Sequence, residues 1–227
     1  MKLRRKEIMA ERRFDLVVFD WDGTLMDSTA LIVASIQAAC AEVGVAVPSR
    51  EAAAHVIGLS LADAMLTIAP GVDEATCQKL VNSYRVHYLA RDHDLVLFDG
   101  AIEVLEGLRG RGYQLAVATG KARRGLSRVL EQSGLGRLFD ATRCADESFS
   151  KPHPAMLLEL MEELFVEPGR TIMIGDTTHD LQMARNAGTA SLAMTYGAHP
   201  EDQLENEQPL AMLDSMAELK EWFACHG

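Results

Sequence analysis

The sequence has few cysteines, few basic residues and no long apolar run. None of its four cysteines forms a C-x-x-C pair or lies beside clustered histidines, which argues against a disulfide framework and a structural zinc site. We therefore expect incidental thiols in a reducing, cytoplasmic protein. No stretch approaches the roughly 20 apolar residues that a membrane span needs. The formal net charge of -11 argues against nucleic-acid binding through a broad basic surface.

The first 13 residues are basic, but they lack the apolar segment of a secretory signal. We expect residues 1–13 to be an N-terminal lead-in to the folded chain. The acidic balance of the whole sequence still permits an anionic substrate, because a bound metal ion can invert the local field.

Short apolar runs alternate with stretches of helical period from residue 94 onward. Continuous apolar runs that end in a turn are typical of buried parallel strands. Strands alternating with helices of this length predict βαβ units and a parallel sheet. The strands are expected at residues 15–19, 114–118, 171–174 and 190–194, with a weaker candidate at 139–144, and a final helix at 209–223.

Residues 28–93 break this alternation, because they carry helical patterns without a strand signal. The segment is too long for a single crossover between two strands. We therefore expect an inserted, all-helical cap domain at residues 28–93. The core domain would then combine residues 14–27 with residues 94–227.

Four polar clusters follow predicted strands, at the edge where open α/β sheets bind ligands. The first places two carboxylates, Asp20 and Asp22, one residue apart. Such a pair can supply a nucleophile and a general acid. The alternatives are a plain Asp-x-Asp-Gly turn or a fragment of an EF-hand loop, although Thr24, Met26 and Ser28 do not match the EF-hand pattern.

The second and third clusters contain groups that can hold an anion. Thr119 and the Gly120 N–H precede a helix and can form an anion site, although a helix cap without a ligand fits the same residues. Lys121 could also reach an anion, but we expect it to be solvated. Lys151, whose backbone is restricted by the proline that follows, could hold a phosphate charge or belong to a loop entering a helix. His153 is expected to be structural.

The fourth cluster contains Asp176 and Asp180, two carboxylates four positions apart. Hard oxygen ligands suit Mg²⁺, and a single neighbouring histidine, His179, favours magnesium over zinc. Asp180 could also cap the following helix. Two carboxylates about 4 Å apart repel by roughly 4 kcal/mol at an effective dielectric near 20, so gathering four aspartates at one edge predicts a divalent cation.

In this order, the four clusters resemble the motifs of the haloacid dehalogenase-like hydrolase superfamily. The segment Asp20-Trp21-Asp22-Gly23-Thr24-Leu25 looks like its first motif, Asp-x-Asp-Gly-Thr-Leu. Thr119 stands for the second motif, Lys151 for the third, and Gly175-Asp176 with Asp180 for the fourth. The helical cap after the first motif looks like the phosphoglycolate phosphatase-like subgroup. This resemblance implies a three-layer, Rossmann-like α/β fold with sheet order 5-4-1-2-3.

The resemblance also implies roles for these residues and a small phosphorylated metabolite as the substrate. Asp20 would form an aspartyl-phosphate, and Asp22 would act as general acid and then as base. The remaining implied roles are phosphoryl binding by Thr119 and Gly120, charge neutralisation by Lys151, and coordination of Mg²⁺ by Asp20, the Asp22 carbonyl, Asp176 and Asp180, the last directly or through water.

Two differences between this sequence and other subgroups of the superfamily narrow the range of possible reactions. The presence of Asp22 favours a phosphate ester over a carbon–halogen bond, and a cap with only one lysine, Lys79, argues against phosphonate chemistry. Residues 58–60 fall where the subgroup places a loop over the active site, although a helix stop and cap fits equally well. An inorganic pyrophosphatase, a phosphosugar mutase and a non-catalytic binding module stay open, as does the choice between monomer and homodimer.

Overall fold

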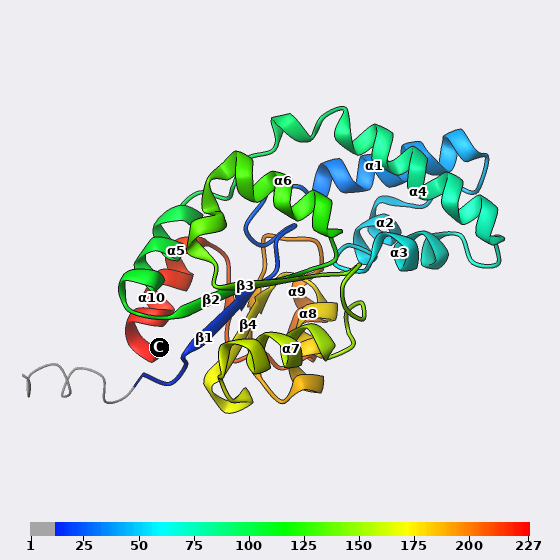
Figure 1. Cartoon of the computed structure of the whole chain (residues 1–227). Helices are drawn as coiled ribbons and strands as arrows, with labels where there is room; N and C mark the ends of the chain where they lie inside the picture. Colours follow the sequence, from blue (N-terminus) through cyan, green and yellow to red (C-terminus); the bar gives the residue numbers. More distant parts are fainter. Residues whose placement is uncertain (1–11) are drawn as a thin grey trace, which may run out of the picture.

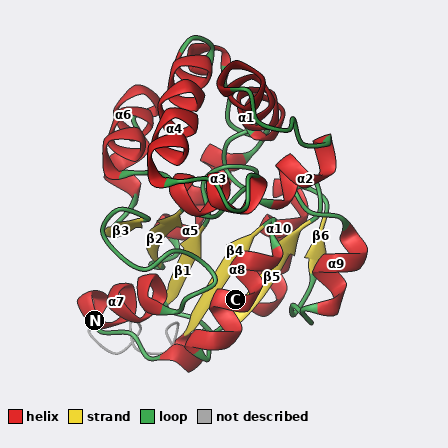
Figure 2. Ribbon diagram, turned by 90° about the vertical axis from the view of Figure 1, so that its right-hand side faces the viewer, coloured by secondary structure: helices red, strands yellow, loops and turns green. Residues whose placement is uncertain are grey.

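The computed structural model describes residues 12–227, so residues 1–11 of the predicted lead-in lie outside the described residues. Its centre is a parallel sheet (Figure 1), and its strands follow the order β3-β2-β1-β4-β5-β6 (Figure 2). The first five strands follow the predicted order, which confirms the α/β fold. The strands are β1 Leu16–Phe19, β2 Gln114–Thr119, β3 Ala141–Cys144, β4 Thr171–Gly175, β5 Ala190–Met194 and β6 Met212–Leu213.

The prediction of one continuous helix over residues 209–223 is wrong. The chain first forms β6, which pairs in parallel with β5 and places Met212 beside Ala193. Helix α10, Met216–His226, begins only after the Ser215 side chain caps it by accepting a hydrogen bond from the Glu218 N–H. A strand of two residues is too short to give a periodic signal, which is why the sequence pattern missed it.

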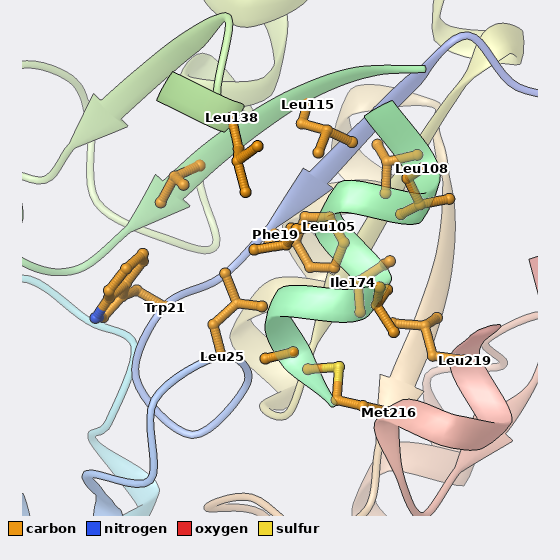
Figure 3. Packing of buried hydrophobic residues seen from close by; sticks show 14 of the residues in the cluster. Phe19, Trp21, Leu25, Leu105, Leu108, Leu115, Leu138, Ile174, Met216 and Leu219 are labelled. Atoms are coloured by element: carbon orange, nitrogen blue, oxygen red, sulfur yellow. The ribbon is translucent and has the colours of Figure 1, made fainter. Parts of the chain in front are cut away.

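Helices cover both faces of the sheet. Successive side chains of a strand point to opposite faces, and all four residues of β1 are buried. The helices of the core are α5 Ala101–Gly110, α6 Arg123–Ser133, α7 Ala155–Leu164, α8 Thr178–Ala187, α9 Glu201–Asn206 and α10, with short 3-10 helices at Leu135–Leu138 and Pro168–Arg170. Val17 and Phe19 pack under α5, α6 and α10, whereas Leu16 and Val18 pack under α7 and α8 (Figure 3 shows the side of Phe19).

Four further helices lie together beyond one edge of the sheet (Figure 2). They enclose an apolar cluster of their own, which includes the buried side chains of Ile36, Met65 and Leu80. These helices are α1 Thr29–Val43, α2 Arg50–His55, α3 Leu61–Ile68 and α4 Glu74–Leu89, followed by a 3-10 helix at Asp92–Asp94.

The chain enters and leaves this helical layer through two paired segments. The Asp27 N–H donates to Val96 O at 3.0 Å, and the Phe98 N–H donates to Leu25 O at 3.0 Å. This pairing and the separate apolar cluster support the division into a cap of residues 28–93 and a core of residues 14–27 and 94–227, which stays a prediction. Within residues 12–227, no helix is both long enough and apolar enough to cross a membrane.

Candidate active site

The segment after β1 brings Asp20 to the carboxyl edge of the central strand. The Asp20 N–H continues the sheet by donating to Ile174 O at 2.9 Å, and the Asp20 side chain is buried. The chain then turns at Gly23, which has φ +82°. A Cβ on Gly23 would lie 2.2 Å from Asp176 Oδ2, so a larger residue would push Asp176 out of place. Gly23 therefore allows the first and the fourth predicted clusters to meet.

Three carboxylates gather at this edge. Asp20, Asp176 and Asp180 are all buried, and each offers an oxygen within 4.8 Å of the others. Asp176 is held by the Thr24 hydroxyl, which donates to Oδ1 at 2.7 Å, and by the Ala198 N–H, which donates to Oδ2 at 2.7 Å. Burial raises the pKa of Asp176 well above its usual value, and the charges of Asp20 and Asp180 add to this effect.

Lys151 joins the carboxylates of two clusters. Its Nζ lies 2.8 Å from Asp20 Oδ1 and 2.6 Å from Asp180 Oδ1, and its side chain is fully buried. Burial alone would lower the pKa of Lys151, but the charges of Asp180 and Asp20 outweigh it and raise the pKa. Burial raises the pKa of Asp20 to about 7, although Lys151 acts in the opposite direction. Lys151 therefore remains an ammonium ion beside the proposed nucleophile.

Asp180 belongs to the acidic cluster and also caps helix α8. Its Oδ2 accepts hydrogen bonds from the Thr177 N–H at 3.1 Å and from the Thr177 hydroxyl at 2.7 Å, and the Asp180 N–H is bonded to Thr177 in return. This is a reciprocal capping box. The predicted capping role of Asp180 is thus present together with its place in the cluster.

The three carboxylates fit a magnesium ion. Lys151 contacts one oxygen of Asp20, yet neither Asp20 oxygen receives a well-directed hydrogen bond from residues 12–227. A buried carboxylate without such partners is costly unless a cation or ligand supplies them. All three candidate ligands are oxygen donors, which Mg²⁺ prefers. The acidic cluster is therefore the part of the described chain best suited to a divalent cation.

The second cluster, Thr119 and Gly120, offers hydrogen-bond donors. Because β1 lies between β2 and β4, these donors follow the strand on the other side of Asp20 from Asp176. Thr119 is buried, and its Oγ1 accepts the Lys121 N–H at 3.2 Å, which leaves the Thr119 hydroxyl hydrogen free to be donated. A Cβ on Gly120 would lie 2.3 Å from Leu59 O and 2.6 Å from Gly58 O. The cap loop of residues 58–60 therefore rests directly on Gly120.

Asp22 is held by two further side chains. The Ser28 hydroxyl donates to Asp22 Oδ1 at 2.7 Å, and Lys121 Nζ lies 2.9 Å from Asp22 Oδ2. The expectation that Lys121 is solvated is wrong, because its side chain is only 11% exposed. Its Nζ also donates to the hydroxyl of Tyr88 on the cap helix α4 at 3.0 Å. The position of Lys121, two residues after Thr119, was the one sequence signal for this contact.

The cap and the core are joined by hydrogen bonds around the site. The Ser60 N–H donates to Ser150 Oγ at 2.8 Å. The carbonyl of His55, at the end of α2, lies 2.8 Å from His179 Nε2 and 3.1 Å from His199 Nε2. His179 therefore bonds to the cap and lies outside the group of carboxylates that could hold a metal. These contacts hold residues 55–60 against the core beside the site.

The family model described as haloacid dehalogenase-like hydrolase matches residues 17–194. This chain belongs to that family. The Probable phosphatase IndB of Dickeya dadantii is 38% identical over 210 residues, which are 90% of this chain and 91% of the relative. Pyrophosphatase PpaX of Bacillus cereus is 32% identical over 209 residues, which are 91% of this chain and 95% of the relative.

The fold of this haloacid dehalogenase-like hydrolase also matches a solved structure. A predicted phosphoglycolate phosphatase from Haemophilus somnus superposes with a TM-score of 0.83 at 24% identity, covering 93% of this chain and 99% of the other. At this identity the match concerns the fold alone.

The structure brings the four predicted clusters together at one edge of the sheet, as expected for parallel strands. Residues 58–60 satisfy both open interpretations, because the loop contacts Gly120 and Ser60 also caps α3. His153 is exposed, and its Nδ1 accepts the Ala155 N–H, which fits a structural role. The contacts of Asp22 with Ser28 and of Asp176 with Thr24 were not foreseen.

We expect Gly120→Ala to lower kcat/KM by about tenfold to a hundredfold, because small displacements at a reacting centre are costly. The added methyl group must push the carbonyls of Gly58 and Leu59, and with them the cap loop, away from the core. The matched control is Gly125→Ala in α6, where a Cβ meets nothing within 4 Å. Steady-state kinetics and thermal unfolding of both variants check this. Full activity in Gly120→Ala would show that the loop contact is irrelevant.

Proposed function

We propose that the chain is a Mg²⁺-dependent phosphatase that hydrolyses a small, phosphoglycolate-like phosphomonoester through an aspartyl-phosphate on Asp20. The observation that carries the proposal is the setting of Asp20. Its carboxylate is buried at the end of β1, is paired on one side with Lys151, and lacks well-directed hydrogen bonds from residues 12–227. A carboxylate placed in this way is suited to attack phosphorus.

The first half of the reaction transfers the phosphoryl group to the protein. An oxygen of Asp20 attacks phosphorus while the bond from phosphorus to the leaving oxygen breaks, and the Asp22 carboxyl gives its proton to that oxygen. We assign the binding of the phosphoryl oxygens to the Thr119 hydroxyl and the Gly120 N–H. Lys151 keeps Asp20 oriented and offsets negative charge.

The second half releases phosphate. The Asp22 carboxylate takes a proton from water as the water oxygen attacks phosphorus, and the bond to Asp20 breaks. Asp20, Asp176 and Asp180 would hold Mg²⁺, with the Asp22 carbonyl as a further proposed ligand. When bound there, the ion supplies positive charge to the transferring phosphoryl group.

Inorganic pyrophosphate is the second candidate substrate. A relative named as a pyrophosphatase is 32% identical over nearly its whole length. A second buried ammonium group, Lys121, lies beside Asp22 on the side where the leaving group would sit, and it could offset the charge of a departing phosphate.

Phosphate release from a panel of metabolites, with and without Mg²⁺, tests the proposal. The panel contains 2-phosphoglycolate, pyrophosphate, hexose phosphates and p-nitrophenyl phosphate. The proposal expects Mg²⁺-dependent release, with kcat/KM highest for a small monoester. A preference for pyrophosphate would move the assignment to the second candidate. Isomerised hexose phosphate without net release would indicate a mutase, and metal-dependent binding without turnover would indicate a binding module.

A further inference from the structure

Two buried ammonium groups contact three of the four aspartate carboxylates of the site. Lys151 contacts Asp20 and Asp180, whereas Lys121 contacts Asp22 and has no other carboxylate within ion-pair distance among residues 12–227. The proposed nucleophile and the proposed acid and base therefore each have a lysine of their own. The function proposed above assigns no role to Lys121 in the hydrolysis of a monoester.

Both oxygens of Asp22 are fixed from different directions. Ser28, which precedes α1, binds Oδ1, and Lys121, which follows β2, approaches Oδ2. Two short contacts from separate segments leave the carboxylate little freedom to rotate. Such fixing is what a proton donor needs, because proton transfer depends on hydrogen-bond distance and alignment.

The burial of Lys121 requires compensation. Taking an ammonium group out of water is unfavourable unless partners replace the lost hydration. Asp22 supplies this compensation, because it is the one carboxylate partner of Lys121 among the described residues.

The remaining contact of Lys121 comes from the cap. Its Nζ donates to the Tyr88 hydroxyl at 3.0 Å and lies 4.8 Å from the centre of the same ring, within range of a cation–π interaction. Tyr84, one turn earlier on α4, stacks on Tyr88 with 5.6 Å between the ring centres. A residue of the core thus links the cap helix α4 to the carboxylate of Asp22.

We propose that Lys121 is a positioning residue that holds Asp22 in line with the leaving-group oxygen, and that Tyr88 makes this arrangement depend on cap closure. The inference rests on the phosphatase function proposed above. An alkoxide leaves poorly without a proton, whereas p-nitrophenolate leaves readily without one. Loss of Lys121 should therefore slow the cleavage of alkyl phosphates selectively.

The test compares kcat/KM for 2-phosphoglycolate and p-nitrophenyl phosphate, because kcat/KM reports steps only up to departure of the leaving group. We expect Lys121→Met to lower kcat/KM for 2-phosphoglycolate about a hundredfold, the usual scale of general acid catalysis, and to lower the value for p-nitrophenyl phosphate far less. Tyr88→Phe should show the same selectivity with a smaller loss. Lys121→Arg should restore part of the lost activity toward 2-phosphoglycolate.

A double variant separates positioning from direct substrate binding. In an Asp22→Asn background, Lys121→Met should cause almost no further loss, because residues that act through one another are not additive. An equal loss for both substrates, or a further loss in that background, would overturn the inference and make Lys121 a substrate ligand. An unchanged kcat/KM in Tyr88→Phe would remove the link to the cap. If the wild type hydrolyses neither substrate, the proposed function itself fails.

Discussion

Asp20→Asn is expected to lower kcat/KM by roughly 10⁴-fold or more, because an amide cannot form the phosphoryl-enzyme intermediate. Asparagine has nearly the same shape as aspartate, so the surrounding packing should be kept. Lys151 would lose one partner but retain Asp180, whose Oδ1 lies 2.6 Å from its Nζ. Steady-state kinetics with the best substrate of the panel measures the effect, and thermal unfolding measures the integrity of the fold.

The matched control for this variant is Asp27→Asn. Asp27 belongs to the same segment, but it is exposed, and its side chain makes no hydrogen bond or ion pair among the described residues. It should keep wild-type activity. Mass spectrometry after acid quenching should find the phosphoryl group on the peptide that contains Asp20 in the wild type and not in Asp20→Asn. Activity above about a tenth of wild type in Asp20→Asn would exclude Asp20 as the nucleophile.

The core of the fold could be predicted because its strands are buried on both faces. Parallel strands under two layers of helices form continuous apolar runs, and β1 and β4 are of this kind. The functional clusters follow these runs because parallel strands all end at the same edge. Asp20 and Asp176 could therefore be placed together although 155 residues separate them in the sequence. β6 was missed because its two residues form no pattern.

The contacts between cap and core could not be predicted in the same way. Lys121 was expected to be solvated because a lysine after a turn is usually exposed. Its burial depends on Tyr88, which comes from another layer of the molecule, and no local periodicity records such a pairing. The hydrogen bonds from His179 and His199 to His55 O also join the two layers, and no local periodicity records them either. These contacts follow from how the helical layer docks on the core, and they surround the groups that would select the substrate.

Removal of the divalent ion should abolish turnover and also destabilise the fold in a pH-dependent way. A bound metal ion stabilises the transition state by several kcal/mol, so its removal with EDTA should lower the activity about a thousandfold. If Mg²⁺ is present at a hundred times its Kd, binding adds about 2.7 kcal/mol to the free energy of unfolding. For a chain of this length we expect a rise in Tm of roughly 5–10 °C.

The pH dependence follows from the carboxyl groups that the ion would contact. Burial raises the pKa of Asp20 to about 7, and it raises the pKa of Asp176 well above the usual value. Without metal, these two carboxyl groups bind more protons in the folded protein than in the unfolded chain at pH values between about 4 and 7, so their contribution to stability falls as the pH rises through this window. Burial lowers the pKa values of His179 and His199, which act in the opposite direction whether or not the metal is bound. Because Mg²⁺ favours the ionised carboxylates, the difference in Tm between Mg²⁺ and EDTA should be larger at pH 8 than at pH 5. Sodium chloride at matched ionic strength controls for screening, and metal-free Asp20→Asn should lose less stability than the metal-free wild type between pH 5 and pH 8. Undiminished activity in EDTA, or a difference in Tm that shrinks toward pH 8, would show that these three carboxylates are not a magnesium site.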